Sequence, residues 1–410
     1  MSEVVPELID FNPYVDAFRQ DPYPHYRRIL SLEGPALWDY MEAYVVARHQ
    51  DATAVLTHPD ISVEPPAEVA ALLASVVPPP LIPMQQTMLF RDPPEHTRLR
   101  SLARHAFTAS ALQDALKSGR RTAQGILGQL RPGDRLEVID DLAYPVALHI
   151  IAEIMGVPEE DVELLKPWSQ AMVPAADIPA RPGAAESATE AYLQFDEYFR
   201  RLTARRRTEG GSGLLMALIA AEAEGVITQE ELHASAALLF VSGHDTLVGF
   251  IANAINTFMA HPDQHALLRS RPELAGQAVS EVLRFESPLQ LATAGGGRWT
   301  TADVTIADRV IPAGHRVITL VAAANRDPAV YTDPDRFDIT RSGSHHLALG
   351  HGLHYCVGAG LVKLQGQMVL EELVRHGLDF TEVTPEREWL PVFIQRRLTR
   401  LDVEITKAEH

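Results

Sequence analysis

The 410-residue sequence contains a single cysteine, Cys356, so no disulfide can form within the chain. Its first residues, MSEVVPELIDFNPYVD, have neither the basic start nor the apolar stretch of a secretory signal. No run of about 18 uncharged apolar residues predicts a membrane span. We therefore expect a cytoplasmic protein that does not bind a membrane.

Positive charge is also scarce, because 36 lysines and arginines face 54 aspartates and glutamates, which gives a formal net charge of -18. Such an excess of acid argues against a protein whose whole surface binds nucleic acid or anionic lipid. Hydrophobic residues at 46% and charged residues at 22% are typical of a soluble globular chain with a sizeable core.

The pattern of apolar residues predicts a mostly helical protein with small β-sheets, an α+β fold. AVSEVLRF and GAGLVKLQGQMVLEELVRHG have apolar residues three and four positions apart, whereas the strand-like pieces EAYVVAR, ADVTIAD and HRVITLVA are short and scattered. The proline-rich stretches VVPPPLIP (76–83) and MVPAADIPARPG (172–183) are typical of loops. No polar linker or internal repeat divides the chain, so we expect one domain over residues 1–410.

The longest predicted helix begins at the capping box of Thr228 and Glu231 and ends at Pro262. At about 1.5 Å per residue it spans roughly 50 Å, enough to cross a whole domain. Its middle contains SGHDT (242–246), in which Gly243 costs on the order of 1 kcal/mol relative to alanine, so we expect a neighbour to pack against that backbone. The acid in this motif either lies on a solvated face or is buried for a function, and its threonine can bond back to the helix.

The single cysteine lies in HHLALGHGLHYCVG (345–358), and its residue types permit three interpretations. Cys356 could be a small buried apolar residue. It could join nearby histidines as a zinc ligand, although the spacing does not match common zinc sites. It could also be a thiolate ligand of haem iron, since glycines let the backbone approach a flat macrocycle and the next helix points its amino end at the sulfur. The residues concerned are His345, His346, His351 and His354 for zinc, and Gly350, Gly352 and Gly358 for haem.

The segment HLALGHGLHYCVGAGLVK resembles the haem-binding loop of the cytochrome P450 family. That loop has phenylalanine, glycine, glycine, histidine, cysteine and glycine at fixed spacing. The matching positions are Leu349, Gly350, Gly352, His354, Cys356 and Gly358. Leucine at 349 departs from the family's phenylalanine, which packs near the thiolate, and we expect this change to alter solvent access to sulfur and the reduction potential.

Other segments resemble the same family in the expected order. DPPEHTRLR (92–100) resembles the segment that binds haem propionates, here through His96 and Arg100, and RWTTADVTIADRVIPAG (298–314) begins with a further propionate-binding arginine, Arg298. His354 is expected to serve a propionate as well. SGHDT resembles the family's central-helix signature, which places Ser242 and Gly243 beside the haem.

Two more motifs resemble the buried ion pair of the family. EVLR carries Glu281 and Arg284 three positions apart, and ANRDPAVYTDPDRFDITR (324–341) resembles the segment that meets this pair, with Arg336 as the expected partner.

The resemblance implies a haem-thiolate monooxygenase with haem b as cofactor and Cys356 as the axial ligand of the iron. A thiolate ligand favours cleavage of the oxygen to oxygen bond, and this cleavage needs protons. The resemblance gives proton delivery to Asp245 and Thr246, which lie about 100° apart around the helix. The chain has no flavin or nicotinamide fingerprint and no cysteine set for an iron–sulfur cluster. We therefore expect electrons from NAD(P)H through a separate ferredoxin reductase and ferredoxin, with Arg98 and Lys363 as candidates for contact with an acidic partner.

The substrate is expected to be an apolar or amphipathic small molecule, because the segments that line the family's pocket are here rich in aliphatic residues. These segments are 64–90, 170–188, 289–297 and 391–395, together with the start of the central-helix motif. The candidate lining residues are Met84, Leu239, Leu289, Leu291, Ala292, Val392 and Phe393. A further expectation is that Gly295 to Gly297 form a bulge that reshapes the pocket.

Alternatives remain at this point. A haem-thiolate protein could bind a ligand as a sensor or carrier without turnover, although such a protein has no need of the proton-delivering pair. A peroxide-driven enzyme is disfavoured for the same reason, and oxidative coupling or epoxidation cannot be separated from hydroxylation by sequence.

Overall fold

The computed structural model describes residues 7–106, 109–177, 181–292, 297–343, 345–383 and 386–407. Most of these residues are helical. The helices are α1 (Asp16–Gln20), α2 (Tyr23–Leu30), α3 (His49–Thr57), α4 (Ala67–Val76), α5 (Ile82–Gln85), α6 (Glu95–Ala106), α7 (Ala109–Leu127), α8 (Tyr144–Met155), α9 (Val162–Met172), α10 (Ala184–Glu209), α11 (Leu214–Ala223), α12 (Gln229–Ala260), α13 (Pro262–Ser270), α14 (Ala275–Phe285), α15 (Val321–Ala324) and α16 (Ala359–Arg375).

The strands form three small sheets. They are β1 (Leu8–Ile9), β2 (Ala36–Trp38), β3 (Ala43–Val46), β4 (Ile61–Ser62), β5 (Arg135–Glu137), β6 (Arg298–Thr300), β7 (Val304–Ile306), β8 (Arg309–Ile311), β9 (Arg316–Thr319), β10 (Leu378–Glu382) and β11 (Asp402–Lys407). The largest sheet has the order β1-β2-β3-β9-β6-β4, in which β3 pairs with β9 in parallel and β6 pairs with β9 antiparallel. The other two are β10-β11-β5 and the hairpin β7-β8. The predicted α+β class is confirmed.

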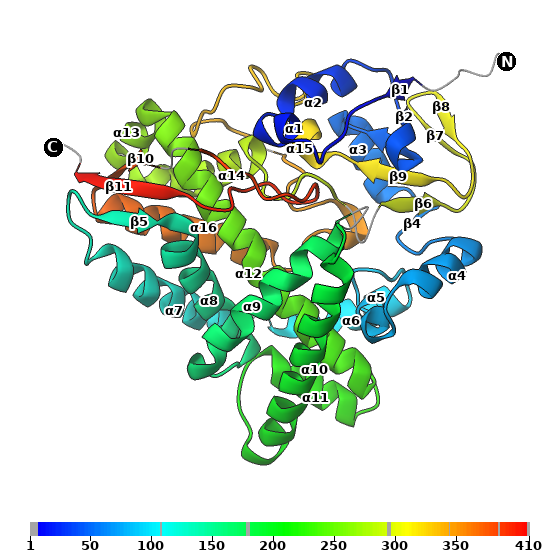
Figure 1. Ribbon diagram of the computed structural model, residues 1–410, viewed down its shortest axis with the longest axis horizontal. Helices are drawn as coiled ribbons and strands as arrows, with labels where there is room; N and C mark the ends of the chain where they lie inside the picture. The colour runs from blue at the N-terminus through cyan, green and yellow to red at the C-terminus, as the bar shows by residue number, and fades with distance from the viewer. Residues whose placement is uncertain are drawn as a thin grey trace.

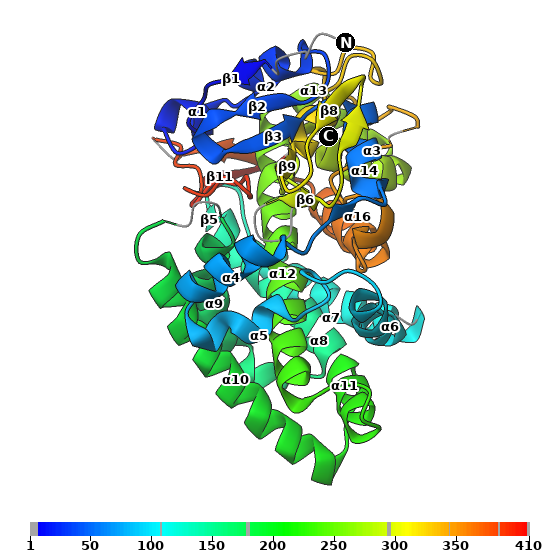
Figure 2. The same ribbon diagram turned by 90° about the vertical axis from the view of Figure 1, so that its right-hand side faces the viewer.

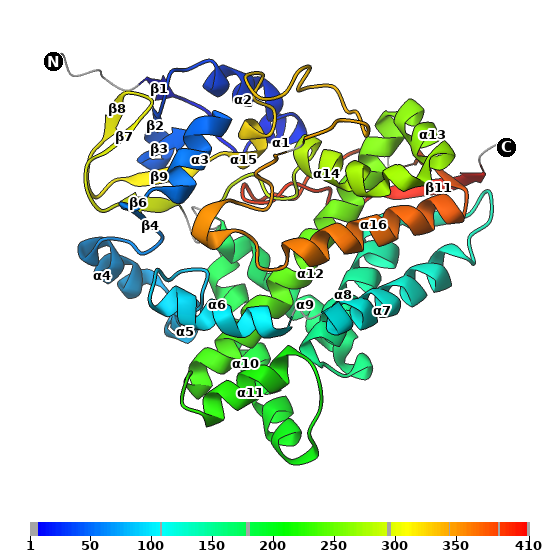
Figure 3. The same ribbon diagram turned by 180° about the vertical axis from the view of Figure 1, so that it is seen from behind.

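The strands of the largest sheet gather with α1, α2 and α3 in one lobe, and the helices α7 to α11 form the other (Figure 1). Helix α12 runs from one lobe into the other, as the view turned by 90° shows (Figure 2). From behind, α6 and α16 lie to the left and right of α12 (Figure 3), and the view of Figure 2 shows both on the same side of that helix. The chain therefore brings α6, α12 and the segment before α16 to the boundary between the lobes.

Helix α12 forms as the sequence predicts. Thr228 Oγ1 accepts from the N–H of Glu231, and the Glu231 carboxylate accepts from the N–H of Thr228, which completes the capping box. The helix is long and apolar enough to cross a membrane by length and composition, but 78% of its most apolar window is buried inside the protein. It is a core helix.

Helix α12 belongs to the largest apolar cluster, which combines α7 to α14 and α16. A separate aromatic cluster lies in the sheet lobe around Trp38, which is fully buried. The proline-rich stretches differ from their predicted loops, because the first forms a 3₁₀ turn over Pro79–Leu81 and leads into α5, and the second contains a 3₁₀ turn over Val173–Ala176. Proline fits both turns because its fixed φ suits the first helical position.

Candidate active site

Backbone contacts of the loop before α16 position the single cysteine. The N–H of Cys356 donates to the carbonyl of Leu349 over 2.9 Å, and Gly350 and Gly352 adopt φ of 71° and 69°. A Cβ at Gly352 would lie 2.6 Å from the Leu56 carbonyl of α3, so only glycine fits this turn. Burial raises the pKa of the Cys356 thiol, while the N–H of Gly358 and the charge of Arg100 oppose that rise.

Four cationic or imidazole side chains meet beside this loop. His96 and Arg100 come from α6, Arg298 from β6, and His354 from the turn before the cysteine. The His96 and His354 rings lie 4.3 Å apart, and Arg100 Nη2 donates to the Tyr355 carbonyl over 2.5 Å. Sequence positions separated by more than 250 residues therefore converge on one place.

Buried nitrogens of this cluster lack hydrogen-bond acceptors among the described protein groups. Burial, then the charges of His354 and Arg100, lowers the pKa of His96 to about 4, and burial lowers the pKa of Arg298 to about 10. His96 Nδ1 and Arg298 Nε are buried and donate to no described group. The nearest carboxylate is Asp92, whose Oδ1 lies 3.7 Å from His354 Nε2. Burial alone would raise the pKa of Asp92, but His354 and Ser62 outweigh it and lower that pKa to about 2.

This donor set fits haem. The two propionates of haem are anions that would accept hydrogen bonds from the unpaired, buried nitrogens beside the cysteine loop. Such nitrogens are costly to bury without a partner. The zinc alternative finds no support, because the described residues contain no group of three or more histidine, cysteine or acidic side chains that could hold a metal ion.

The central-helix motif divides between two faces of α12. Ser242 Oγ donates to the Leu238 carbonyl over 2.7 Å, and Thr246 Oγ1 donates to the Ser242 carbonyl over 3.3 Å, so both hydroxyls lie on one stripe. Gly243 serves helix packing, since a Cβ there would lie 2.4 Å from Cδ1 of Ile151 on α8. Its Cβ direction thus faces α8, and the contact of Gly243 with the cofactor stays a prediction.

Asp245 is buried, with 3% of its surface exposed, so the solvated alternative for this residue is wrong. Gln395 Nε2 donates to Asp245 Oδ2 over 2.5 Å, and Arg397 Nη2 lies 3.7 Å from Asp245 Oδ1. Sequence reasoning missed Gln395 and Arg397. They lie 150 residues or more from the motif and outside any helix or strand, so no spacing pattern links them to it.

The buried ion pair forms as predicted, but its third member differs. Glu281 and Arg284 are 1% and 0% exposed and are joined by two hydrogen bonds of 2.8 Å. Arg336 contributes its backbone carbonyl to Arg284, while its side chain is 65% exposed. The guanidinium that reaches Glu281 belongs to Arg341, at 3.3 Å. Arg336 was therefore the wrong side chain.

The predicted lining residues are split between the two cores. Met84 and Leu239 pack in the helical cluster, and Leu289 and Ala292 are partly exposed. The Phe393 ring instead packs against Phe11, Phe18 and Trp38, and Leu291 belongs to the same aromatic cluster. Val392 is buried as well, and contact of these residues with a substrate stays a prediction. The proposed bulge at Gly295 to Gly297 lies mostly outside the described residues.

The predicted contacts for an acidic partner also differ. Arg98 is bound to Glu231 and Glu95, at 2.6 Å and 2.7 Å, and so ties α6 to the start of α12. It was therefore a poor candidate for a free surface charge, whereas Lys363 on α16 is exposed.

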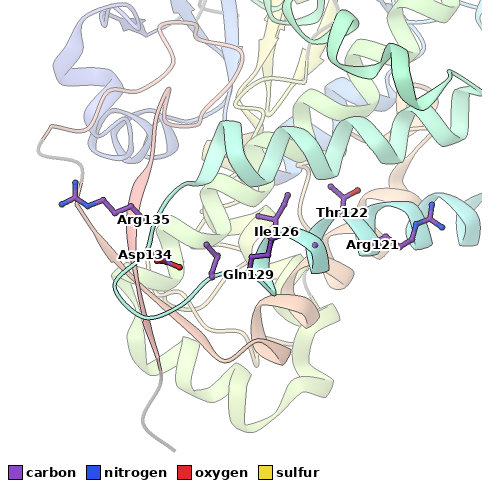
Figure 4. A pocket seen from close by; sticks show the side chains of 8 residues that line it. Arg121, Thr122, Ile126, Gln129, Asp134 and Arg135 are labelled. Atoms are coloured by element: carbon purple, nitrogen blue, oxygen red, sulfur yellow. The ribbon is translucent and has the colours of Figure 1, made fainter.

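A separate cavity of about 600 Å³ opens between α7 and the chain entering β5. Figure 4 shows Arg121 and Arg135 at its opposite ends. It is lined by Arg121, Thr122, Gly125, Ile126, Gln129, Leu130, Asp134 and Arg135, none of which belongs to the cysteine loop or α12. It is not part of the site.

Comparisons with known proteins agree with this site. The family model "Cytochrome P450" matches residues 163–388, more than half of the chain. The biotin biosynthesis cytochrome P450 of Bacillus subtilis is 36% identical over 318 residues, which are 78% of this chain and 80% of that protein. The vitamin D(3) 25-hydroxylase of Pseudonocardia autotrophica is 34% identical over 372 residues, covering 87% and 86%.

A solved structure shares the whole fold. P450BioI, in complex with an acyl carrier protein ligated to hexadec-9Z-enoic acid, has a TM-score of 0.86 and 31% identity, and the match covers 95% of this chain and 99% of that one. The chain therefore belongs to the cytochrome P450 family, whose members are haem b oxidoreductases that act on small molecules with dioxygen and a redox partner.

Proposed function

We propose that this cytochrome P450 hydroxylates an apolar or amphipathic small molecule at a haem held between α12 and the cysteine loop. The observation that carries the proposal is the cluster of His96, Arg100, Arg298 and His354 beside Cys356, with buried nitrogens that no described protein group accepts from. A protein without an anionic cofactor would leave these buried hydrogen-bond donors, which belong to arginine and histidine side chains next to Cys356, without an acceptor.

When bound, haem b supplies the iron at which dioxygen is activated and the substrate is oxidised. Cys356 would hold the iron through sulfur, and the N–H of Gly358 would stabilise the thiolate. The four side chains of the cluster would hold the propionates by donating hydrogen bonds to them. Gly350 turns the chain in a left-handed conformation, and the Leu349 carbonyl accepts a hydrogen bond from the N–H of Cys356.

Protons reach the site from α12. Thr246 presents its hydroxyl on the same stripe as Ser242, and Asp245, its neighbour in sequence, carries the acid group. Because the two residues are about 100° apart around the helix, the hydroxyl can face the substrate side while the carboxyl stays buried. Loss of the Thr246 hydroxyl is expected to divert reducing equivalents into peroxide.

Electrons come from a redox partner, as in the family. We infer a ferredoxin, reduced by a ferredoxin reductase with NAD(P)H, and a cytoplasmic location. The exposed Lys363 on α16, the helix that follows Cys356, supports contact with an acidic partner on this side.

Two relatives guide the choice of probe substrates. One is named for vitamin D3 and another was solved with a hexadec-9Z-enoyl carrier protein. Both molecules are largely apolar with a polar end, which agrees with the aliphatic residues proposed to line the site, among them Met84, Leu239 and Leu289.

The test is turnover by the purified haem protein with ferredoxin, ferredoxin reductase, NADPH and isotope-labelled dioxygen. Vitamin D3, hexadec-9Z-enoic acid and a compound library are first screened for displacement of the iron-bound water. A product containing one labelled oxygen atom is expected from at least one compound that shifts the spectrum. Compounds that bind but are never oxidised would favour the sensor or carrier alternative.

A further inference from the structure

The carboxylate of Asp245 has two oxygens in unlike surroundings. Oδ2 accepts a hydrogen bond from Gln395 Nε2 over 2.5 Å. Oδ1 is buried and accepts no hydrogen bond from a described group, although Arg397 Nη2 lies 3.7 Å away. One oxygen is thus anchored, and the other faces a positive charge with its lone pairs unused.

The second partner, Arg397, is held in place from three sides. Its Nη2 donates to the Tyr144 hydroxyl over 3.1 Å, and its Nη1 donates to the Leu398 carbonyl over 3.2 Å. On α12, a Cβ at Gly249 would lie 3.8 Å from Arg397 Cδ and 3.2 Å from Pro288 Cβ. The aliphatic part of Arg397 therefore packs closely against the backbone of α12 at this glycine. The guanidinium is 8% exposed and cannot move away freely.

Other titratable groups around Asp245 are Tyr144 on α8 and His244 on α12. Burial, then the charge of Asp245, raises the pKa of Tyr144 to about 12, so its hydroxyl keeps its proton at neutral pH. Burial lowers the pKa of His244, whose Nδ1 is 2.7 Å from the Phe240 carbonyl and whose Nε2 is 2.9 Å from Ser169 Oγ. Arg397 is thus the cation that balances the Asp245 carboxylate.

We propose that Arg397 is a positioning residue for proton delivery, which leaves Asp245 Oδ1 as the oxygen that carries the proton. Gln395 fixes Oδ2, Arg397 balances the charge without occupying Oδ1, and Tyr144 holds Arg397 at that distance. When the O–H bond at Oδ1 breaks, the proton passes toward the Thr246 side, and the carboxylate left behind faces Arg397 until solvent supplies another proton. This inference rests on the proposed function of Asp245.

The first test reads the carboxyl group itself and needs no substrate. Infrared spectra of the ferric haem protein are compared for wild type, Arg397→Gln and the double variant Arg397→Gln/Asp245→Asn. Removing one partner of a buried pair leaves an uncompensated charge, which is relieved by taking up a proton. We expect a new carboxylic-acid carbonyl band in Arg397→Gln that the double variant lacks and Arg397→Lys largely removes. Absence of the new band would overturn the inference.

The second test measures peroxide released per dioxygen consumed, with vitamin D3 or hexadec-9Z-enoic acid and again without added substrate. Arg397→Gln and Tyr144→Phe should both raise this ratio and increase the solvent isotope effect. The values for Arg397→Gln should lie closer to those of Asp245→Asn than the values for Tyr144→Phe do. For Arg397→Gln we expect a fall of about tenfold in the rate of coupled turnover, below the usual range for loss of an acid–base group.

Arg396→Gln is the matched control, because Arg396 is the adjacent buried arginine but pairs with Glu286. It should leave the peroxide ratio of the folded protein unchanged. If Asp245→Asn raises the ratio and Arg397→Gln does not, the inference about Arg397 fails while the proposed function stands. If Asp245→Asn has no effect either, the proposed proton delivery itself fails.

Discussion

Single residues explain two features that the sequence leaves unresolved. Gly243 is a helix-centre glycine because Ile151 of α8 occupies the space that its Cβ would fill. His346 is one of four histidines near the cysteine, yet it is half-buried near Lys363 and Arg284 and joins no metal cluster among the described residues. Both residues contribute to packing around the site.

Gly243→Ala should lower the free energy of unfolding by about 1–3 kcal/mol, because the new methyl group meets Ile151 in a tightly packed contact. Chemical denaturation of Gly243→Ala, Ile151→Ala and the double variant measures this effect. We expect the double variant to be more stable than the sum of the single effects, since Ile151→Ala removes the clashing atoms. Additive effects would show that the contact is not the reason for the glycine.

The stability of the protein should fall as pH drops from about 6.5 toward 4, and His346 should account for part of this loss. Burial, then Lys363 and Arg284, lowers the pKa of His346 to about 4, so the unfolded chain binds a proton that the folded one resists. His346→Gln should therefore reduce the loss by up to about 3 kcal/mol, measured by denaturation across this range. An unchanged pH profile would contradict the assignment.

At the scale of elements, periodicity and caps predicted α12, α14 and α16 and the strands β3, β7 and β9, because each depends on a local pattern. Contacts between distant segments could not be predicted in the same way. The clearest cases are the C-terminal segment that brings Gln395 and Arg397 to α12, and the turn of Phe393 into the aromatic cluster. Side-chain direction in such irregular segments depends on tertiary packing.

The ion pair on α14 tests one such contact between distant segments, because its third member was not predicted from the sequence. Arg341→Met should destabilise the fold by about 1.5–3 kcal/mol, because it removes a hydrogen bond to the buried Glu281 and three more to backbone carbonyls. Arg336→Met should change stability by no more than about 0.5 kcal/mol, since that side chain is exposed. Thermal unfolding of the two variants compares them directly, and the reverse order would restore Arg336 as the partner.

At the scale of the whole molecule, the fold joins α6, α12, β6 and the cysteine loop where the two lobes meet (Figure 2). The sequence supports the family and the members of this site because the motifs keep their order along the chain. It does not show that His96 Nδ1, Arg298 Nε and His354 Nε2 are buried without a described hydrogen-bond partner, which is the observation that supports an anionic cofactor. The roles of Leu349 and of the glycines at 295 to 297 stay predictions.

The spectrum of the reduced protein under carbon monoxide tests the central claim most directly. Thiolate ligation by Cys356 predicts the red-shifted Soret band of haem-thiolate proteins in the wild type, and Cys356→Ser should lose that band while its overall fold, followed by circular dichroism, is retained. A wild-type protein that binds haem without the shifted band, or a Cys356→Ser variant that keeps it, would contradict the account.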